Sequence, residues 1–272
     1  MNTIATKSTA QALAPQHRWQ RRGVRFAQAL ILPFALILGW SMASASAWID
    51  PKVLPSPAAV FNILTATLTD AVFWQGVAAS LARNLTAYLL GASLGVGFAL
   101  IIGSSKIANW LLAPSFHMLR QISLFAWLPI LSSFLGTGNS AKILFISLAV
   151  FYPVALHSLQ GIRSISHKHR EVAAVYQFPW AYRYQKLILP AAAPQIFVGL
   201  QLGLVFAWLA TIGSEFLLAS HGVGIGQWVI RGREQFNVGL IMVGMLAIGS
   251  LGLLFNRILV AIERRVLTWN VR

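Results

Sequence analysis

The sequence predicts an all-α membrane protein, a bundle of six transmembrane helices. Hydrophobic residues make up 57% of the 272 residues and charged residues only 10%, whereas charged residues make up about 25% of an average soluble domain. Several apolar stretches approach the length of about 20 residues that a helix needs to cross the hydrocarbon core of a bilayer. Together, these observations exclude an ordinary soluble domain.

The apolar stretches define six predicted spans, of which the third and fourth contain Pro129 and Pro153. The spans are Phe26–Ala47, Leu85–Gly103, His117–Leu135, Ile143–Leu159, Ile196–Ala219 and Val238–Ile262. Prolines stop the first span, and we expect a short amphipathic helix along the membrane surface before the second. The first span could also be a signal peptide cleaved near residues 43–47. Its apolar run exceeds the usual 7–15 residues of a signal core, which favours a retained span.

Basic residues predict the direction in which the chain crosses the membrane. With a cytosolic N-terminus, sixteen of the 21 Lys and Arg residues, Arg120 among them, lie on or near the cytosolic face, as the positive-inside rule requires. The other five are Lys52, Arg83, Lys142, Arg231 and Arg233. We therefore expect a cytosolic tail at residues 1–25, a transmembrane domain at 26–262 and a second cytosolic tail at 263–272.

Charge and cysteine content narrow the class of partner. The formal charge of +15 reflects only six acidic residues as much as the many basic ones. Such a charge can indicate nucleic-acid binding, but the high apolar content favours membrane lipid as the surrounding medium and argues against nucleic acid. The chain has no cysteine, so disulfides, thiolate catalysis and cysteine-based metal sites are excluded.

Two glycine pairs indicate close contacts between helices. Gly91 and Gly95, like Gly199 and Gly203, are spaced by four residues, a spacing that lets two helix backbones approach. A membrane helix that merely tolerates glycine remains the alternative.

The predicted cytosolic loop at residues 161–190 has the pattern of two short helices. Ser166 can cap a helix that ends at Tyr176, on which Val172, Val175 and Tyr176 form one apolar face. Phe178-Pro179 breaks this helix and opens a second, which Pro190 is expected to end. Exposed aromatic and apolar residues on such a loop are typical of a surface that fills a partner's groove.

This loop resembles the EAA loop of the permease subunits of bacterial ABC importers, E-A-A-x3-G-x9-I-x-L-P. The matched positions are Glu171, Val172, Ala173, Gln177, Leu187, Leu189 and Pro190. The resemblance implies that they and Tyr176 form a cytosolic coupling helix on an ATPase subunit. Gln177 replaces the glycine of the pattern, although glycine accepts φ > 0 and other residues resist it by about 1 kcal/mol or more.

The likeness extends from about Leu54 to Trp269 and is closest to the nitrate/sulfonate/taurine branch of these permeases. Its motifs are Leu54-Pro55-Ser56-Pro57, Ser80-Leu81-Ala82-Arg83, Gly136-Thr137-Gly138, Phe206-Ala207-Trp208, Ser214-Glu215 and Glu263-Arg264-Arg265. The resemblance implies a type I importer in the bacterial inner membrane. Two permease copies would associate with two ATPase subunits, receive substrate from an external solute-binding protein, and carry a small anion such as nitrate, taurine or a sulfonate.

The chain carries no ATP site of its own. A P-loop needs the pattern G-x4-G-K-[ST], and no Gly-Lys pair occurs in the sequence. We therefore predict a subunit that is not an enzyme, has no cofactor, and depends on a partner chain for ATP hydrolysis.

Two polar residues within the spans are candidates for the translocation path. Glu215 is the one acid placed inside a span, where a charge faces protein or water rather than lipid. The alternative is a structural pair between Glu215 and Arg231 or Arg233. Gln201, in the middle of the same span, should face a partner or water. Histidines show no pair spaced by four residues, so no metal site is predicted.

Three rival functions remain open. An ion-gradient-driven secondary transporter or channel predicts several intramembrane charges and inverted repeats. A membrane-bound enzyme would need a catalytic set that is not visible in the sequence. A non-transporting subunit would need no polar path.

Overall fold

A computed structural model describes residues 16–46, 49–218 and 223–268, with side chains from Ile31 onward except at Arg170, Ala174 and Trp180. Within these ranges every regular element is helical, which confirms the predicted all-α class. The chain divides into two units, Met1–Phe61 and Asn62–Arg272.

The first unit contains helix α1, Gln16–Ala45. Residues 16–25 belong to this helix, so that part of the predicted N-terminal tail is helical, while residues 1–15 lie outside the described range. Trp40 donates a hydrogen bond from Nε1 to the Pro55 carbonyl oxygen at 2.9 Å. Helix α2, Pro57–Thr69, starts at a proline, whose missing N–H is not needed at the first helical position.

Four helices of the second unit are long and apolar enough to cross a membrane, within the part of the chain that the structure describes. These helices are α3 (Ala71–Ser104), α6 (Asn139–Arg163), α9 (Leu189–Leu217) and α11 (Val238–Val266). A fifth candidate is a bent pair of shorter helices. Within α1, the segment Ile31–Ala45 forms a shorter apolar helix.

The prediction of a continuous third span at His117–Leu135 is wrong. Helix α4, Lys106–Leu119, is followed by a single turn, η1 (Leu124–Ala126), and by α5, Trp127–Leu135, and the chain bends by 90° between them. Ser123 is extended, with φ of −54° and ψ of 131°, and so ends the helical path. Pro129 lies in the first turn of α5, where backbone N–H groups have no partner within the helix. This proline therefore favours a new helix over the continuation of the old one.

Side chains with oxygen acceptors begin several helices. Asp70 accepts a hydrogen bond from Val72 N at 2.8 Å at the start of α3. Asn237 accepts one from Leu240 N at 3.1 Å at the start of α11. Each satisfies an N–H group that lacks a partner in the first turn.

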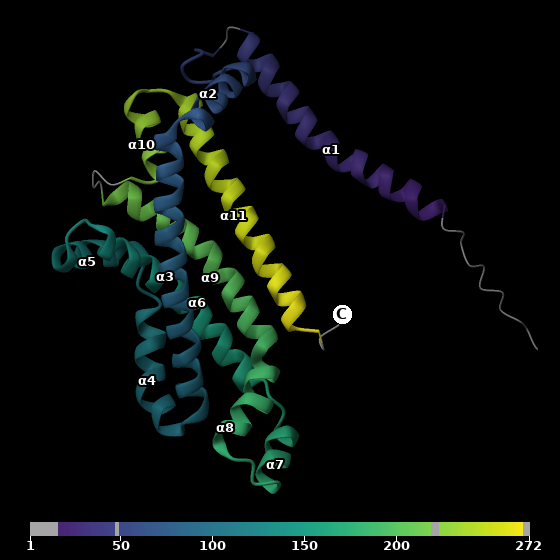
Figure 1. The fold of residues 1–272 in the computed structure, drawn as a ribbon, viewed down its shortest axis with the longest axis vertical. Coiled ribbons are helices and arrows are strands. Elements are labelled where there is room, and N and C mark those ends of the chain that lie inside the picture. The colour runs from purple at the N-terminus through teal and green to yellow at the C-terminus, as the bar shows by residue number, and fades with distance from the viewer. Residues whose placement is uncertain (1–15, 47–48, 219–222, 269–272) are drawn as a thin grey trace, which may run out of the picture. The chain divides into compact units, whose positions relative to one another are not determined.

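Helix α6 packs between α3 and α9 (Figure 1) and forms the centre of the second unit. Phe145, Ile146, Val150 and Val154 of α6 are completely buried there. A Cβ atom on Gly91 would overlap the Ser147 carbonyl oxygen of α6. Gly91 therefore lets the backbones of α3 and α6 approach closely, as predicted.

The glycines of α9 meet α6 in the same way. A Cβ atom on Gly199 would lie 3.0 Å from the Cβ of His157, and one on Gly203 would lie 3.0 Å from Val154 Cγ2. These separations are shorter than ordinary van der Waals contact, so only glycine permits this spacing between α6 and α9.

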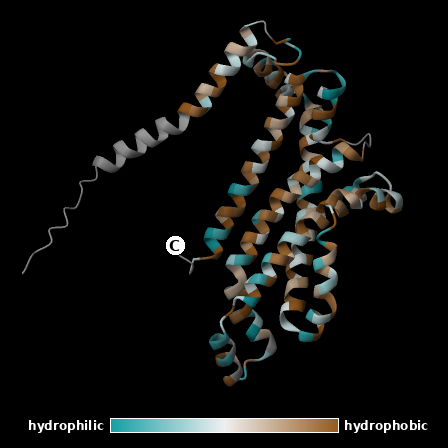
Figure 2. Cartoon of the chain, turned by 180° about the vertical axis from the view of Figure 1, so that it is seen from behind, coloured by the Kyte–Doolittle hydropathy of each residue, from teal (hydrophilic) through white to brown (hydrophobic). Residues whose placement is uncertain are grey.

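Much of the apolar surface of the second unit is exposed. Leu89, Leu94, Met245 and Leu253 are between 56% and 63% exposed on α3 and α11. Figure 2 shows the long helices mainly in the colours of hydrophobic residues, with hydrophilic residues near the end of α11. Exposed apolar surface of this extent is expected of helices that lie in lipid.

Candidate functional site

The segment at residues 161–190 contains two short helices, as predicted. They are α7, His167–Val175, and α8, Trp180–Arg183, and they are separated at Phe178-Pro179. After α8 the chain widens into a π-helix, η2, Tyr184–Ile188, which runs directly into α9.

Pro190 does not end a helix, contrary to the prediction. It is the second residue of α9, where its missing N–H is tolerated. The Leu189 N–H bonds to the Tyr184 carbonyl oxygen, five residues back, and this wider turn makes room for the proline. Leu187, Leu189 and Pro190 are half-buried at this junction.

The residues predicted to contact the ATPase form an open surface on α7. Val172, Val175 and Tyr176 are 51%, 77% and 70% exposed, and the Tyr176 ring stacks on Phe178 with 5.9 Å between ring centroids. Glu171 forms an exposed pair with His167, with 3.0 Å between Oε1 and Nδ1. Single large apolar residues are common on protein surfaces, but an aromatic stack beside two exposed valines is typical of a docking surface.

Ala173 differs from its neighbours because it is buried, at 3% exposure. Its carbonyl oxygen accepts a hydrogen bond from Phe178 N at 3.1 Å. This bond spans six residues and closes the end of α7 as in a Schellman motif, in which the residue before the donor takes φ > 0. That residue is Gln177, with φ of 49°, so the bend forms although glycine is replaced.

Replacing Gln177 with glycine is expected to stabilise the end of α7 by about 1 kcal/mol, because glycine accepts positive φ without steric cost. Hydrogen exchange at the Phe178 amide measures this change, and its protection should rise about fivefold. The matched variant Gln177→Ala should show no gain, since alanine keeps the Cβ. Equal protection in both variants would mean that the backbone angle carries no strain.

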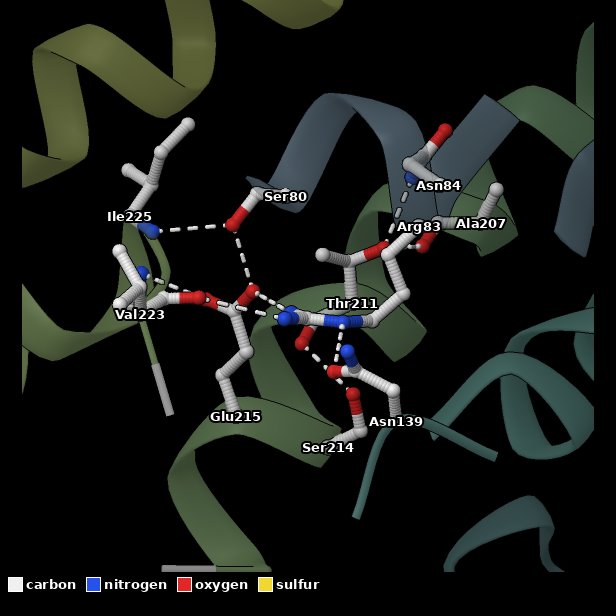
Figure 3. A network of polar contacts seen from close by, with 11 residues as sticks. Ser80, Arg83, Asn84, Asn139, Ala207, Thr211, Ser214, Glu215, Val223 and Ile225 are labelled. Carbon is white, nitrogen blue, oxygen red and sulfur yellow. Dashed lines mark hydrogen bonds and ion pairs between the residues drawn. The ribbon is translucent and has the colours of Figure 1, made fainter. Parts of the chain in front are cut away.

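At the other end of the bundle, Glu215 lies in a buried polar network (Figure 3). Its side chain is 2% exposed and pairs with Arg83 Nη1 of α3, whose side chain is 4% exposed. Ser80 donates from Oγ to Glu215 Oε1 at 2.5 Å, and the Gly226 N–H donates to Oε2 at 2.7 Å. Both carboxylate oxygens are thus occupied, as a buried charge requires.

The predicted pairing of Glu215 with Arg231 or Arg233 is wrong. Both arginines of α10 (Gly226–Glu234) lie on aromatic rings instead, Arg231 at 5.5 Å from Trp228 and Arg233 at 5.0 Å from Phe216. Glu215 does form a structural ion pair, but its partner is Arg83.

Arg83 links four parts of the second unit. It donates from Nε to Asn139 Oδ1 at the start of α6 and from Nη2 to the Val223 carbonyl oxygen, each at 3.2 Å. The next residue of α3, Asn84, donates to Thr211 Oγ1 of α9 at 2.8 Å. The network therefore joins α3, α6 and α9 to the segment before α10.

Lys142 of α6 completes this region. It is 2% exposed and interacts electrostatically with both Arg83 and Glu215. The predicted spans begin at Leu85 and Ile143 and so leave out Arg83 and Lys142, whereas α3 and α6 begin at Ala71 and Asn139 and include them. The sequence does contain a signal for this pairing. A buried carboxylate such as Glu215 needs a cation nearby, and Arg83 is the basic residue of the motif Ser80-Leu81-Ala82-Arg83.

Gln201 is not part of this network. Its Nε2 donates to Glu263 Oε2 of α11 at 2.6 Å, which agrees with the expectation that this amide faces a partner. The bond joins α9 to the end of α11. Of the predicted C-terminal tail, residues 263–266 belong to α11, and residues 269–272 lie outside the described range.

No group of three potential metal ligands occurs among the residues that the structure describes. The network around Glu215 and the bond between Gln201 and Glu263 join helices to one another.

Comparison with known proteins agrees with the sequence motifs and the helical fold. The "Putative aliphatic sulfonates transport permease protein SsuC" of Bacillus subtilis is 31% identical over 97% of this chain and 94% of its own length. The "Bicarbonate transport system permease protein CmpB" of Synechococcus elongatus is 30% identical over 88% and 90%. The "Taurine transport system permease protein TauC" of Escherichia coli is 30% identical over 88% of both chains.

A protein family accounts for two thirds of the chain. Residues 90–268 match the family described as "Binding-protein-dependent transport system inner membrane component". The match covers helices α4 to α11 and includes the segment at residues 161–190. The chain therefore belongs to the binding-protein-dependent transport system inner membrane components, the permease family of ABC import systems.

Proposed function

We propose that this chain is the transmembrane subunit of an ATP-driven importer. It forms the path for a small solute and is coupled to a separate ATPase through residues 161–190. The observation that carries the coupling is the exposed surface of Val172, Val175 and Tyr176 at the end of α7. A short turn at residues 176–179 joins α7 to α8, which continues through the π-helix η2 into α9 without a break. A push on this surface is therefore transmitted to a membrane helix through one short turn.

The proposed topology has six spans: α1, α3, the bent pair α4 and α5, α6, α9 and α11. Both termini and the segment at residues 161–190 lie on the cytosolic side of a bacterial inner membrane, as the distribution of basic residues favours. Two copies associate as a homodimer with two ATPase subunits and receive solute from an external binding protein. ATP binding closes the ATPase subunits and moves both α7 surfaces together, which switches the spans between inward-facing and outward-facing states.

The bonding of Glu215 favours this function over ion-gradient-driven transport. A carboxylate that relays protons must be able to take one up. Glu215 instead accepts bonds from Ser80, Arg83 and the Gly226 N–H, so both of its carboxylate oxygens are engaged by the protein. We therefore assign it to holding helices together and not to the path.

The solute is proposed to be a small anion of the sulfonate, taurine or nitrate type. Support comes from the relatives, whose printed names specify aliphatic sulfonates, taurine, nitrate and bicarbonate.

Uptake into proteoliposomes tests this function. The vesicles contain the permease with its ATPase and binding protein, and labelled butanesulfonate, taurine and nitrate are offered separately. We expect ATP-dependent uptake of at least one of them. Uptake should stop when the P-loop lysine of the ATPase is replaced and should not recover when only a proton gradient is imposed. Uptake driven by the gradient alone would contradict the proposal.

A further inference from the structure

A cavity of about 380 Å³ lies between the α4–α5 bend, α6 and α9, apart from the network around Glu215. Its polar lining groups are Arg120, Tyr152 and His157. The apolar lining residues are Ile122, Leu124, Ala149, Pro153, Leu156, Leu202 and Phe206. Cavities of 300–1,000 Å³ with apolar walls and a few polar groups are typical of small-molecule sites.

The cavity lies near the middle of the bundle and not at either end. Tyr152 is about 20 Å along α6 from Asn139 and about 17 Å from Arg163, at 1.5 Å per residue. Arg120, which is exposed, lines the same cavity as Tyr152 and therefore lies at this level of the bundle. The bend after α4 ends that helix halfway and places Arg120 at this depth.

An arginine at this depth is costly unless it faces water, protein or an anion. The cavity lining, all within the described part of the chain, contains no acidic side chain. Glu263 of α11 accepts a hydrogen bond from Gln201 Nε2 and does not line the cavity. Arg120 therefore gives the cavity a positive charge that its lining does not neutralise.

His157 adds a second observation that indicates a ligand. Its Nδ1 atom is buried and has no hydrogen-bond partner within the structure, and leaving such an atom unpaired costs about 1–3 kcal/mol. An oxyanion in the cavity would accept a hydrogen bond from the Nδ1–H group and so supply the missing partner. Tyr152 and Arg120 can donate to the same anion.

We infer that this cavity binds an aliphatic oxyanion such as an alkylsulfonate, with its charged head at Arg120 and His157 and its chain along Leu202 and Phe206. The inference rests on the proposed function and specifies which class of anion is carried. Burial of each methylene strengthens binding by about fourfold. Nitrate and bicarbonate have no methylenes and gain nothing from the apolar walls, so the cavity discriminates against them.

Direct binding to the purified permease–ATPase complex, without the binding protein, tests this assignment. Labelled butanesulfonate should bind saturably, methanesulfonate should compete more weakly, and nitrate should not compete at similar concentrations. Arg120→Ala should weaken binding by about 10- to 100-fold, and Arg120→Lys should recover part of it. The matched control is Arg257→Ala, an exposed arginine on α11, which should bind as the wild type.

Several outcomes would overturn the inference. Binding that is unchanged by Arg120→Ala, or nitrate that competes as well as butanesulfonate, would refute it, as would no binding at all. Each variant must also co-purify with the ATPase, which shows that it is folded. If the complex binds butanesulfonate but ATP drives no uptake of any solute, the assignment of the cavity is supported and the proposed function is contradicted. If ATP drives uptake without butanesulfonate binding, the function stands and the cavity assignment fails.

Discussion

Replacing Glu215 with glutamine is expected to destabilise the permease by about 3–5 kcal/mol, because it leaves the buried charge of Arg83 without its partner. The loss should extend to the start of α10, since the carboxylate also accepts the Gly226 N–H. Thermal unfolding in detergent, followed by tryptophan fluorescence, should show a midpoint lower by on the order of 10 °C.

Two further variants separate a lost ion pair from a general effect of substitution. Glu234→Gln alters an exposed acid on α10 and should leave the unfolding midpoint within about 1 °C, since surface changes have small effects. The double variant Arg83→Met/Glu215→Leu removes both charges and should cost less than Glu215→Gln alone. If Glu215→Gln unfolds at the same temperature as Glu234→Gln, the ion pair does not stabilise the fold.

Replacing Tyr176 with aspartate is expected to abolish stable association with the ATPase subunit. Tyr176 is 70% exposed and stacks on Phe178, and aromatic anchors of interfaces contribute about 2 kcal/mol or more, which corresponds to about a 30-fold loss of affinity. Co-purification of the untagged ATPase on a tagged permease measures this loss, and ATP-dependent uptake should fall with it.

The matched control for Tyr176→Asp is Phe236→Asp at the other end of the bundle. Phe236 is 82% exposed and precedes α11, far along the helices from α7 (Figure 1). Its replacement should leave the association with the ATPase intact. Val175→Asp should behave as Tyr176→Asp does, because it lies on the same face of α7. Complexes that survive both α7 substitutions would place the ATPase contact elsewhere.

Local sequence patterns were sufficient to predict features that depend on a single helix. The apolar runs predicted α6, α9 and α11, and Phe178-Pro179 predicted the break between α7 and α8. Prolines were less informative, because the cost of a missing N–H depends on where the proline falls in a helix. Pro190 lies at the start of α9 and Pro129 in the first turn of α5, so neither breaks the helix that contains it.

By itself, the sequence determined the all-α class, the membrane setting, the exposed face of α7 and the likeness to importer permeases, since each depends on composition or on residues close together in the chain. Only the tertiary structure decided the partners of buried charges. Arg83 and Glu215 are 132 residues apart, and several bases could have paired with this carboxylate. The same holds for the cavity around Arg120 and His157, because its lining residues come from the α4–α5 bend, α6 and α9, which are far apart in the chain.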